Sequence, residues 1–451
     1  MLTTLAAPAF AKTWHIEDGD ITVKAGDTKG TNKVSQGEST DVPDTDTVIT
    51  NREKNASSHT VTIETNDKND KVEVTLKDVN IDTSSRKEAA VSVTGEGDTN
   101  IKLDGDNALK SDIYRSGIYG SGSVTISGGS TVTANGGNGT ISGGDGICSN
   151  GGVTISGGST VTANGGNGGS LVGGDGIRSG GGLTVSDGTV TAKGGNGDSK
   201  DGYGGDGIRS GGVVTISGNT VNAAGGYGGK VGGYGICSFD RVAISGGTVE
   251  AAGGNGSTGG GSGIYSSVID LSGSLELTAK AGSPNGKALL QAGHELDLDT
   301  IKDKLDPGAK VTVTDADGKV NQVSIPRPVE PEEPVIPEES SSSSDGGSAT
   351  PSTPASPLPG LTVTDKSGAV ISYTSTQSGN TLTVCVGRFT ASFRISLAAL
   401  RPLRAEGIET ITFQTILCST TLSVDELLAM GGEDAEAVLT HRLTDSSLTV
   451  G

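Results

Sequence analysis

The chain has 451 residues, a formal net charge of −20 and only 3% aromatic residues, while 75 of its residues are glycine. The acidic balance argues against nucleic acid and anionic membranes as partners, because both carry negative charge. The scarcity of aromatic side chains excludes a large globular core and favours a slender aliphatic one. No apolar run reaches about 18 residues, so the sequence predicts no membrane-spanning helix.

The first residues have the pattern of an export signal. Ala9, Phe10 and Ala11 form a small-x-small cleavage pattern directly after an apolar stretch. We therefore interpret residues 1–11 as a signal-peptide remnant and expect a secreted or cell-surface protein. An ordinary apolar N-terminus is the alternative.

Residues 12–110 contain alternating stretches such as "DITVKAG", "HTVTIET" and "KVEVTLKDVNID". Alternation of apolar and polar residues predicts strands. We expect these strands to form irregular N-terminal coils and a cap, because the open end of a repeat array exposes unpaired strands and must be covered.

Residues 111–282 form a glycine-rich repeat. The dipeptide "GI" recurs 28 to 31 residues apart, beginning at Gly117, Gly146, Gly176, Gly207, Gly235 and Gly263. Each repeat continues with a stretch such as "VTIS" and then one such as "TVTA", separated by glycine turns. Three short strands per repeat predict an all-β, right-handed parallel β-helix with a period of about 29 residues, whose coils stack at about 4.8 Å.

Alternation within the strands predicts three buried columns, one for each strand of the coil. The first contains Ile118, Ile147, Ile177, Ile208, Ile236 and Ile264; the second contains Ile126, Ile155, Val185, Ile216 and Ile244; the third contains Val132, Val161, Val190, Val221 and Val249. We expect the glycines to lie at corners that require positive φ. The asparagines of the "GGNG" corners, Asn138, Asn167, Asn196 and Asn255, are interpreted as hydrogen bonders between coils.

The chain then changes character. Residues 283–325 are expected to end and cap the β-helix, and residues 326–359, rich in proline and serine, to form a disordered linker. Residues 360–451 predict a small α+β domain with "TLTVCV" and "TASFRI" as paired strands. Its expected helices are "SLAALRPLRAEG" and "SVDELLAMGG", the latter capped by Ser423.

The four cysteines divide into two pairs. Cys148 and Cys237 occupy the same position in coils three apart, roughly 14 Å from each other at the usual strand spacing. A disulfide requires Cα atoms within about 7 Å, so we expect two free thiols. Cys385 and Cys418 lie in the C-terminal domain, and whether they pair is left open.

Several stretches together resemble a bacterial family. They are "TWHIEDGDITV", "VTIETNDKNDKVEVTLKDVNID", "AAVSVTGEGDTNIKLDGDNAL" and "SGIYGSGSVTISGG" with its repeats. They are similar to secreted bacterial carbohydrate-binding-domain-containing proteins, which are right-handed parallel β-helices. The resemblance covers residues 13–282 and implies binding of an extracellular glycan, but it transfers no binding residues. The chain departs from many carbohydrate modules in having a single tryptophan, Trp14.

Three aspartates precede "GI" in successive coils: Asp145, Asp175 and Asp206. Stacked carboxylates about 5 Å apart either repel one another or recruit a cation, so calcium is the one cofactor that we consider. The alternative, which we favour, is a solvated ladder of carboxylates without metal.

The position after "GI" holds Tyr119, Arg178, Arg209 and Tyr265. Beside Asp175 and Asp206 these side chains are predicted to form an outward stripe that binds sugar hydroxyls or uronate carboxylates. A plain surface stripe with local Asp–Arg pairs is the alternative.

Together these features favour a non-catalytic, secreted or cell-surface bacterial β-helix that binds polysaccharide or acts as an adhesin. A polysaccharide lyase or hydrolase on the same fold is one alternative, and a purely structural stalk is another. Against an enzyme, no catalytic residue can be assigned: the four histidines are scattered through the sequence, and only Arg178 and Arg209 lie beside repeated aspartates.

Overall fold

The computed structural model describes residues 11–65, 67–326, 360–364, 370–371, 373–378, 380–386, 390–415, 419–432, 435–442 and 445–450. The chain divides into two compact units, Met1–Glu333 and Pro334–Gly451. Nearly all of the predicted signal-peptide remnant and of the predicted linker lies outside the described residues. None of the described helices is both long and apolar enough to cross a membrane.

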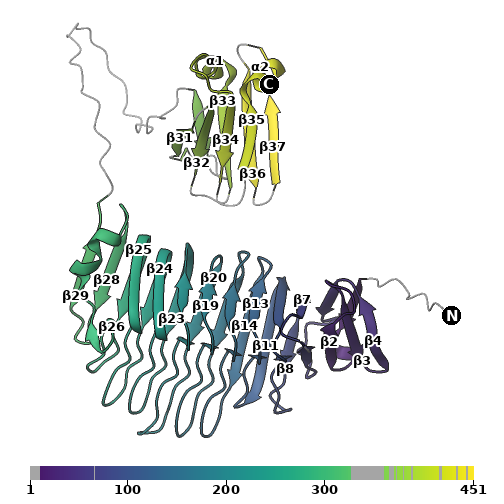
Figure 1. Ribbon diagram of the computed structural model, residues 1–451, viewed down its shortest axis with the longest axis vertical. Coiled ribbons are helices and arrows are strands. Elements are labelled where there is room, and N and C mark those ends of the chain that lie inside the picture. Colours follow the sequence, from purple (N-terminus) through teal and green to yellow (C-terminus); the bar gives the residue numbers. More distant parts are fainter. Residues whose placement is uncertain are drawn as a thin grey trace, which may run out of the picture. The chain divides into compact units, whose positions relative to one another are not determined.

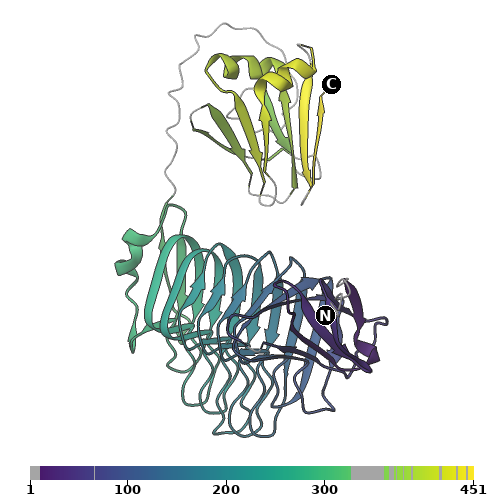
Figure 2. The same ribbon diagram turned by 45° about the vertical axis from the view of Figure 1, so that its right-hand side comes forward.

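The first unit is a parallel β-solenoid of about 11 turns, which confirms the predicted all-β fold class (Figure 1). Its strands form three ladders, each of which pairs equivalent residues of successive coils. Figure 2 shows these coils stacked side by side along the unit.

The GI ladder consists of β2 (Ile21–Ala25), β6 (Val61–Glu64), β9 (Val91–Thr94), β12 (Ile118–Gly120), β15 (Ile147–Ser149), β18 (Ile177–Ser179), β21 (Ile208–Ser210), β24 (Ile236–Ala252), β25 (Ile264–Lys280) and β26 (Leu289–Gln291). The VTIS ladder consists of β1 (Lys12–His15), β5 (Thr47–Thr50), β7 (Lys71–Lys77), β10 (Asp98–Asp104), β13 (Val124–Ser127), β16 (Val153–Ile155), β19 (Leu183–Val185) and β22 (Val214–Ile216), and continues in β24. The TVTA ladder consists of β8 (Asn80–Asp82), β11 (Asp106–Ile113), β14 (Thr131–Gly137), β17 (Thr160–Asn164), β20 (Thr189–Lys193) and β23 (Asn219–Ala224), and continues through β24 and β25 to β28 (Lys310–Thr314).

The predicted core columns are confirmed. Every isoleucine and valine assigned to the three columns is buried, with at most 1% of its surface exposed. Because parallel pairing places identical positions of successive coils next to each other, each column fills its own strip of the core.

The corner glycines need a different explanation from the one expected. Positive φ occurs at Gly128, Gly157 and Gly188, in the turns between the second and third strands. Among the described residues, the glycines of the GGDG and GGNG corners are not in that conformation. A Cβ on Gly166 would instead overlap the backbone of Gly137 in the preceding coil. These corners require glycine because backbone packs directly against backbone.

Both ends of the solenoid are irregular, as expected. At the start, β2 pairs antiparallel with β3 (Asn32–Gln36), which pairs with β4 (Ser39–Asp44). The Nε1–H of Trp14 donates to Asp44 Oδ2 at 2.7 Å, and the indole is only 2% exposed. The single tryptophan is therefore part of the cap and offers no platform for a sugar. At the other end, β27 (His294–Glu295), the short helix η2 (Leu298–Lys304) and β29 (Val320–Ser324) follow.

The described residues of the second unit form two four-stranded sheets and two helices. One sheet has the order β30 (Leu361–Thr364), β33 (Thr390–Ser396), β36 (Glu436–Arg442), β37 (Asp445–Val450), and the other β31 (Thr374–Ser378), β32 (Thr381–Cys385), β34 (Thr410–Gln414), β35 (Ser419–Ser423). The helices are α1 (Leu397–Ala405) and α2 (Val424–Met430), and the Ser423 hydroxyl accepts the Glu426 N–H at 3.4 Å.

One expected pairing in this unit is wrong. The stretches "TLTVCV" and "TASFRI" were expected to pair, but β32 and β33 lie in different sheets. Strand β33 pairs instead with β30 and β36, which come from distant parts of the sequence.

Cys385 is a free thiol, and Cys418 lies outside the described residues. Cys148 and Cys237 are free, as predicted.

The buried columns lead to a direct test of the fold. Replacing Ile155 by Asp places an unpaired charge in the core and should cost about 4 kcal/mol of folding free energy, which lowers the melting temperature by roughly 10 °C. Thr154, the outward-facing neighbour on β16, provides the control variant Thr154→Asp. Thermal unfolding followed by circular dichroism decides: equal melting temperatures for the two variants would contradict the assignment of Ile155 to the core.

Candidate functional site

The GI ladder brings four of the six predicted carbohydrate-binding residues into one column. Register pairs link Tyr119 to Cys148, Cys148 to Arg178, Arg178 to Arg209, Arg209 to Cys237, and Cys237 to Tyr265. Toward the N-terminus the same column continues through Ser92 and Thr62. We call these eight residues the GI column. The predicted stacking of this position along the solenoid is confirmed.

The neighbouring aspartates are arranged differently from the expectation. The interpretation as a solvated ladder is wrong, because Asp175 and Asp206 are only 7% and 4% exposed. Asp145 Oδ1 accepts the backbone N–H of Asp175 at 2.7 Å, and Asp175 Oδ1 accepts that of Asp206 at 2.7 Å. Asp206 Oδ1 accepts the N–H of Tyr234 in turn. Each carboxylate therefore joins one coil to the next, and Asp175 and Asp206 are withdrawn from direct contact with a ligand.

Burial changes the protonation of this ladder. It raises the pKa of Asp206 to about 6, although the Arg209 guanidinium, 3.3 Å from the carboxylate, opposes the rise. Burial and the charges of its two neighbouring aspartates raise the pKa of Asp175 well above its usual range. Burial likewise raises the pKa of the Cys148 thiol to about 12, so this thiol is a poor nucleophile.

The geometry of the described residues gives no support to a metal site at the aspartates. The part of the chain that the structure describes contains no group of three or more His, Cys, Asp or Glu side chains placed to hold a metal ion. One oxygen of each aspartate is already occupied by a backbone N–H. We therefore derive no role for calcium at Asp145, Asp175 and Asp206.

Stability should depend on pH through this ladder. A carboxyl whose pKa is raised by folding stabilises the protein below the unfolded pKa of about 4, and this contribution is lost as the pH rises through the folded value. Asp175→Asn keeps an acceptor for the Asp206 N–H but carries no charge. We expect this variant to gain melting temperature relative to the parent as the pH rises above about 4, the unfolded pKa of Asp175.

The comparison between parent and variant isolates Asp175 from carboxyls whose pKa is lowered by folding. The control is Asp187→Asn, since Asp187 is exposed. A difference between Asp175→Asn and the parent that stays constant across this pH range would contradict the buried-carboxyl assignment.

A pocket of about 520 Å³ lies at the N-terminal end of the GI column. Its lining residues are Thr60, Thr62, Lys87, Glu88, Ala89, Ser92, Thr94, Tyr114, Arg115, Ser116, Tyr119, Asp145 and Cys148. Of the residues predicted from the sequence to bind carbohydrate or metal, Tyr119 and Asp145 contribute to it. The register pairs make Thr62, Ser92 and Tyr119 neighbours across three coils, so the pocket has a row of hydroxyl groups.

Two residues that line the pocket have an unusual backbone. Lys87 and Tyr114 have φ of 61° and 64°, and they are two of only six non-glycine residues with positive φ in the described chain. Such conformations are costly and concentrate at functional sites. The Tyr114 hydroxyl is 2.6 Å from Thr140 Oγ1, which fixes the ring beside the pocket.

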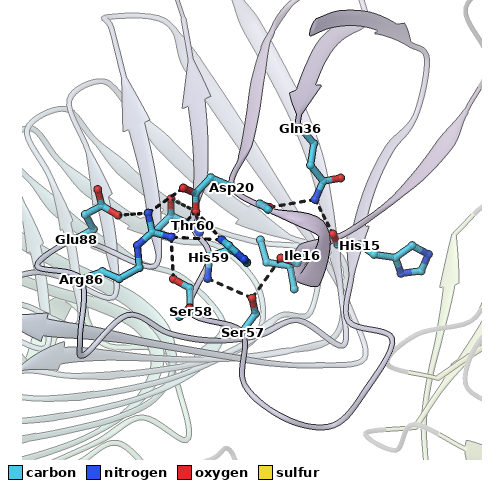
Figure 3. Close-up of polar contacts among 11 residues, drawn as sticks. His15, Ile16, Asp20, Gln36, Ser57, Ser58, His59, Thr60, Arg86 and Glu88 are labelled. Atoms are coloured by element: carbon cyan, nitrogen blue, oxygen red, sulfur yellow. Dashed lines mark hydrogen bonds and ion pairs between the residues drawn. The ribbon is translucent and has the colours of Figure 1, made fainter. Parts of the chain in front are cut away.

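An ionic network braces the segment that carries Lys87 and Glu88 (Figure 3). Arg86 contacts both oxygens of Asp20, at 2.7 and 2.8 Å, and its Nη2 lies 3.2 Å from Glu88 Oε2. Asp20 Oδ1 also accepts the Thr60 N–H, and His59 Nδ1 lies 3.3 Å from the same oxygen. Burial would raise the pKa of Asp20, but Arg86 and the Thr60 N–H lower it to about 2. Sequence reasoning missed this network because its bonded partners lie up to 66 residues apart.

The network predicts how the pocket wall behaves when Arg86 is removed. Arg86→Gln should release residues 83–89 and speed their amide hydrogen exchange by roughly tenfold. Arg52→Gln is the matched control, because Arg52 also contacts both oxygens of one aspartate, Asp18, but lines none of the pocket. Equal exchange of residues 83–89 in the two variants would show that Arg86 does not brace the wall.

Comparison with known proteins adds no assignment. No family model, no curated protein and no solved structure matches the chain.

Proposed function

We propose that this protein is a non-catalytic, secreted or cell-surface module that binds polysaccharide along the GI column. The observation that carries the proposal is the pocket at the end of the column, where the hydroxyls of Thr62, Ser92 and Tyr119 follow one another across three coils. Recognition of sugars combines such polar groups with aromatic faces, which Tyr119 and Tyr114 supply.

The rest of the column determines the kind of polymer. Arg178 is exposed and Arg209 is half-buried, and they are direct neighbours in successive coils. Guanidinium groups form bidentate hydrogen bonds with carboxylates, so this pair of arginines favours polymers that contain uronates. Tyr265 stacks on Tyr234 with ring centroids 5.1 Å apart and provides a second aromatic position further along the solenoid. Weak contacts at each coil would add through multivalency.

Affinity electrophoresis of the full chain in gels that contain neutral or acidic polysaccharides tests the proposal. We expect an acidic polymer to retard the parent, and we expect Arg178→Ala with Arg209→Ala to weaken retention roughly tenfold. Tyr119→Ala should weaken it independently. The control is Thr184→Ala, an outward residue of a neighbouring strand on the VTIS ladder.

Failure would take two distinguishable forms. If no polymer retards the parent, the structural stalk becomes the better account of the fold. If a polymer retards the parent and all variants equally, binding occurs elsewhere than on the GI column.

One observation favours an enzyme as the second candidate. The pocket is lined by two carboxyls, Glu88 and Asp145, and burial raises the pKa of Asp145. Glycoside hydrolases use a pair of carboxyls of which one is a protonated acid with a raised pKa. Release of reducing ends, or absorbance of unsaturated uronates, from a retained polymer would support this candidate, provided that Asp145→Asn abolishes the release.

A further inference from the structure

The loops between the TVTA and GI ladders form a second surface, separate from the GI column. We define the loop edge as residues 137–144, 165–174, 194–205 and 225–233. Figure 1 shows loops of successive coils projecting together from one side of the strands. Backbone bridges join Ser142 to Val172, Val172 to Tyr203, and Tyr203 to Val231, so the loops are in register coil by coil.

Most of the exposed large apolar side chains of the solenoid lie on the loop edge or directly next to it. Seven of the twelve exposed large apolar residues in the described chain lie there, each between 38% and 54% exposed. They are Ile113, Tyr114, Ile141, Leu171, Val172, Tyr203 and Tyr227. Tyr114 bonds to Thr140 of the first loop, and Lys230 Nζ lies 5.5 Å from the centre of the Tyr203 ring. Exposed apolar side chains gathered on adjacent coils in this way mark an interaction surface.

The loop edge is also electrically neutral. Its four segments contain two aspartates, Asp198 and Asp201, and two lysines, Lys200 and Lys230, in a chain whose net charge is −20. Two copies of an acidic chain repel each other over most of their surface, but not across this strip. A second copy that approaches the edge therefore meets no net charge there.

The backbone hydrogen bonds of the loop edge indicate that a partner would be bound through side chains. Leu171 N–H donates to Ile141 O, and Tyr203 N–H donates to Leu171 O, so these groups are used between coils of the same chain. An added strand would find few free partners, and the contact must be made by side chains. Four of the seven residues are aliphatic, which suits a protein surface better than sugar rings: Ile113, Ile141, Leu171 and Val172.

We infer that the loop edge is a self-association surface that pairs two copies of this chain. Apolar side chains on the edge follow the coil spacing of about 4.8 Å, and a second solenoid of the same sequence has the same spacing. Two edges related by a two-fold axis can thus interdigitate over several coils, whereas a partner with another repeat would match at one or two positions only. This inference is independent of the proposed polysaccharide binding.

Sedimentation velocity of the full chain over a range of concentrations tests the inference. We expect the parent to shift from monomer to dimer, and the double variant Leu171→Asp, Tyr203→Asp to remain monomeric because it buries like charges at the contact. The control Val320→Asp changes another exposed apolar residue, in the C-terminal cap of the solenoid, and should dimerise like the parent. Thermal melts verify that both variants are folded.

A second readout keeps the test decisive if the double variant unfolds. Hydrogen exchange of the parent should slow in residues 165–174 and 194–205 as its concentration rises, while exchange in β29 stays unchanged. Because the edge is neutral, the dissociation constant should change less than about threefold between about 0.05 M and about 0.5 M salt. A parent that stays monomeric up to about 100 μM, or a folded double variant that dimerises like the parent, would overturn the inference.

Discussion

The hydrogen-bonded pairing of each residue with its equivalent in the next coil is the constraint on which the rest of this molecule depends. It fixes the distance between coils, so backbone approaches backbone at the GGDG and GGNG corners and leaves no room for a Cβ at Gly166 or Gly174. The same pairing turns any side chain repeated in the sequence into a column in space. Core columns, the GI column and the loop edge are three consequences of one repeat.

The columns of Asn and Asp side chains stabilise the stacking of successive coils. Asn138 and Asn167 each accept a backbone N–H of the following coil, as predicted for the GGNG corners. The aspartates do the same at the neighbouring corner, but they bring charge into a buried site. Asn performs this role without a titratable group. Asp makes the stability of the stacked coils depend on pH, because its buried carboxyl favours the neutral form.

Much of the fold could be predicted from the sequence, because the spacing of the repeat shows directly which residues of successive coils pair. The spacing of "GI" placed Ile147 beside Ile177 and Cys148 beside Arg178, and alternation placed Ile155 in the core. Burial of Asp175 could not be predicted, since alternation applies to strands and not to corners, where the turn decides which way a side chain points. Aspartate is also rarely buried in general.

The pocket and the C-terminal sheets were missed for a different reason. The pocket depends on Arg86, Lys87 and Tyr114, which belong to irregular coils and have no repeat to align them. In the C-terminal unit, closeness in sequence favours a hairpin between neighbouring strands. The partners of β33 are instead β30 and β36, the latter at least 40 residues away, and only the packed sheet selects them.

The GI column and the loop edge lie on different parts of each coil, and this separation has a consequence for function. A dimer formed through the loop edge would leave Thr62, Ser92, Arg178 and Arg209 of both GI columns outside the contact, although Tyr114 both lines the pocket and adjoins the edge. Two columns held in one particle bind a long polymer with a higher effective concentration than two free chains. Weak contacts per coil would then suffice for firm retention, which is the regime expected when a coil offers at most one polar or aromatic side chain to the polymer.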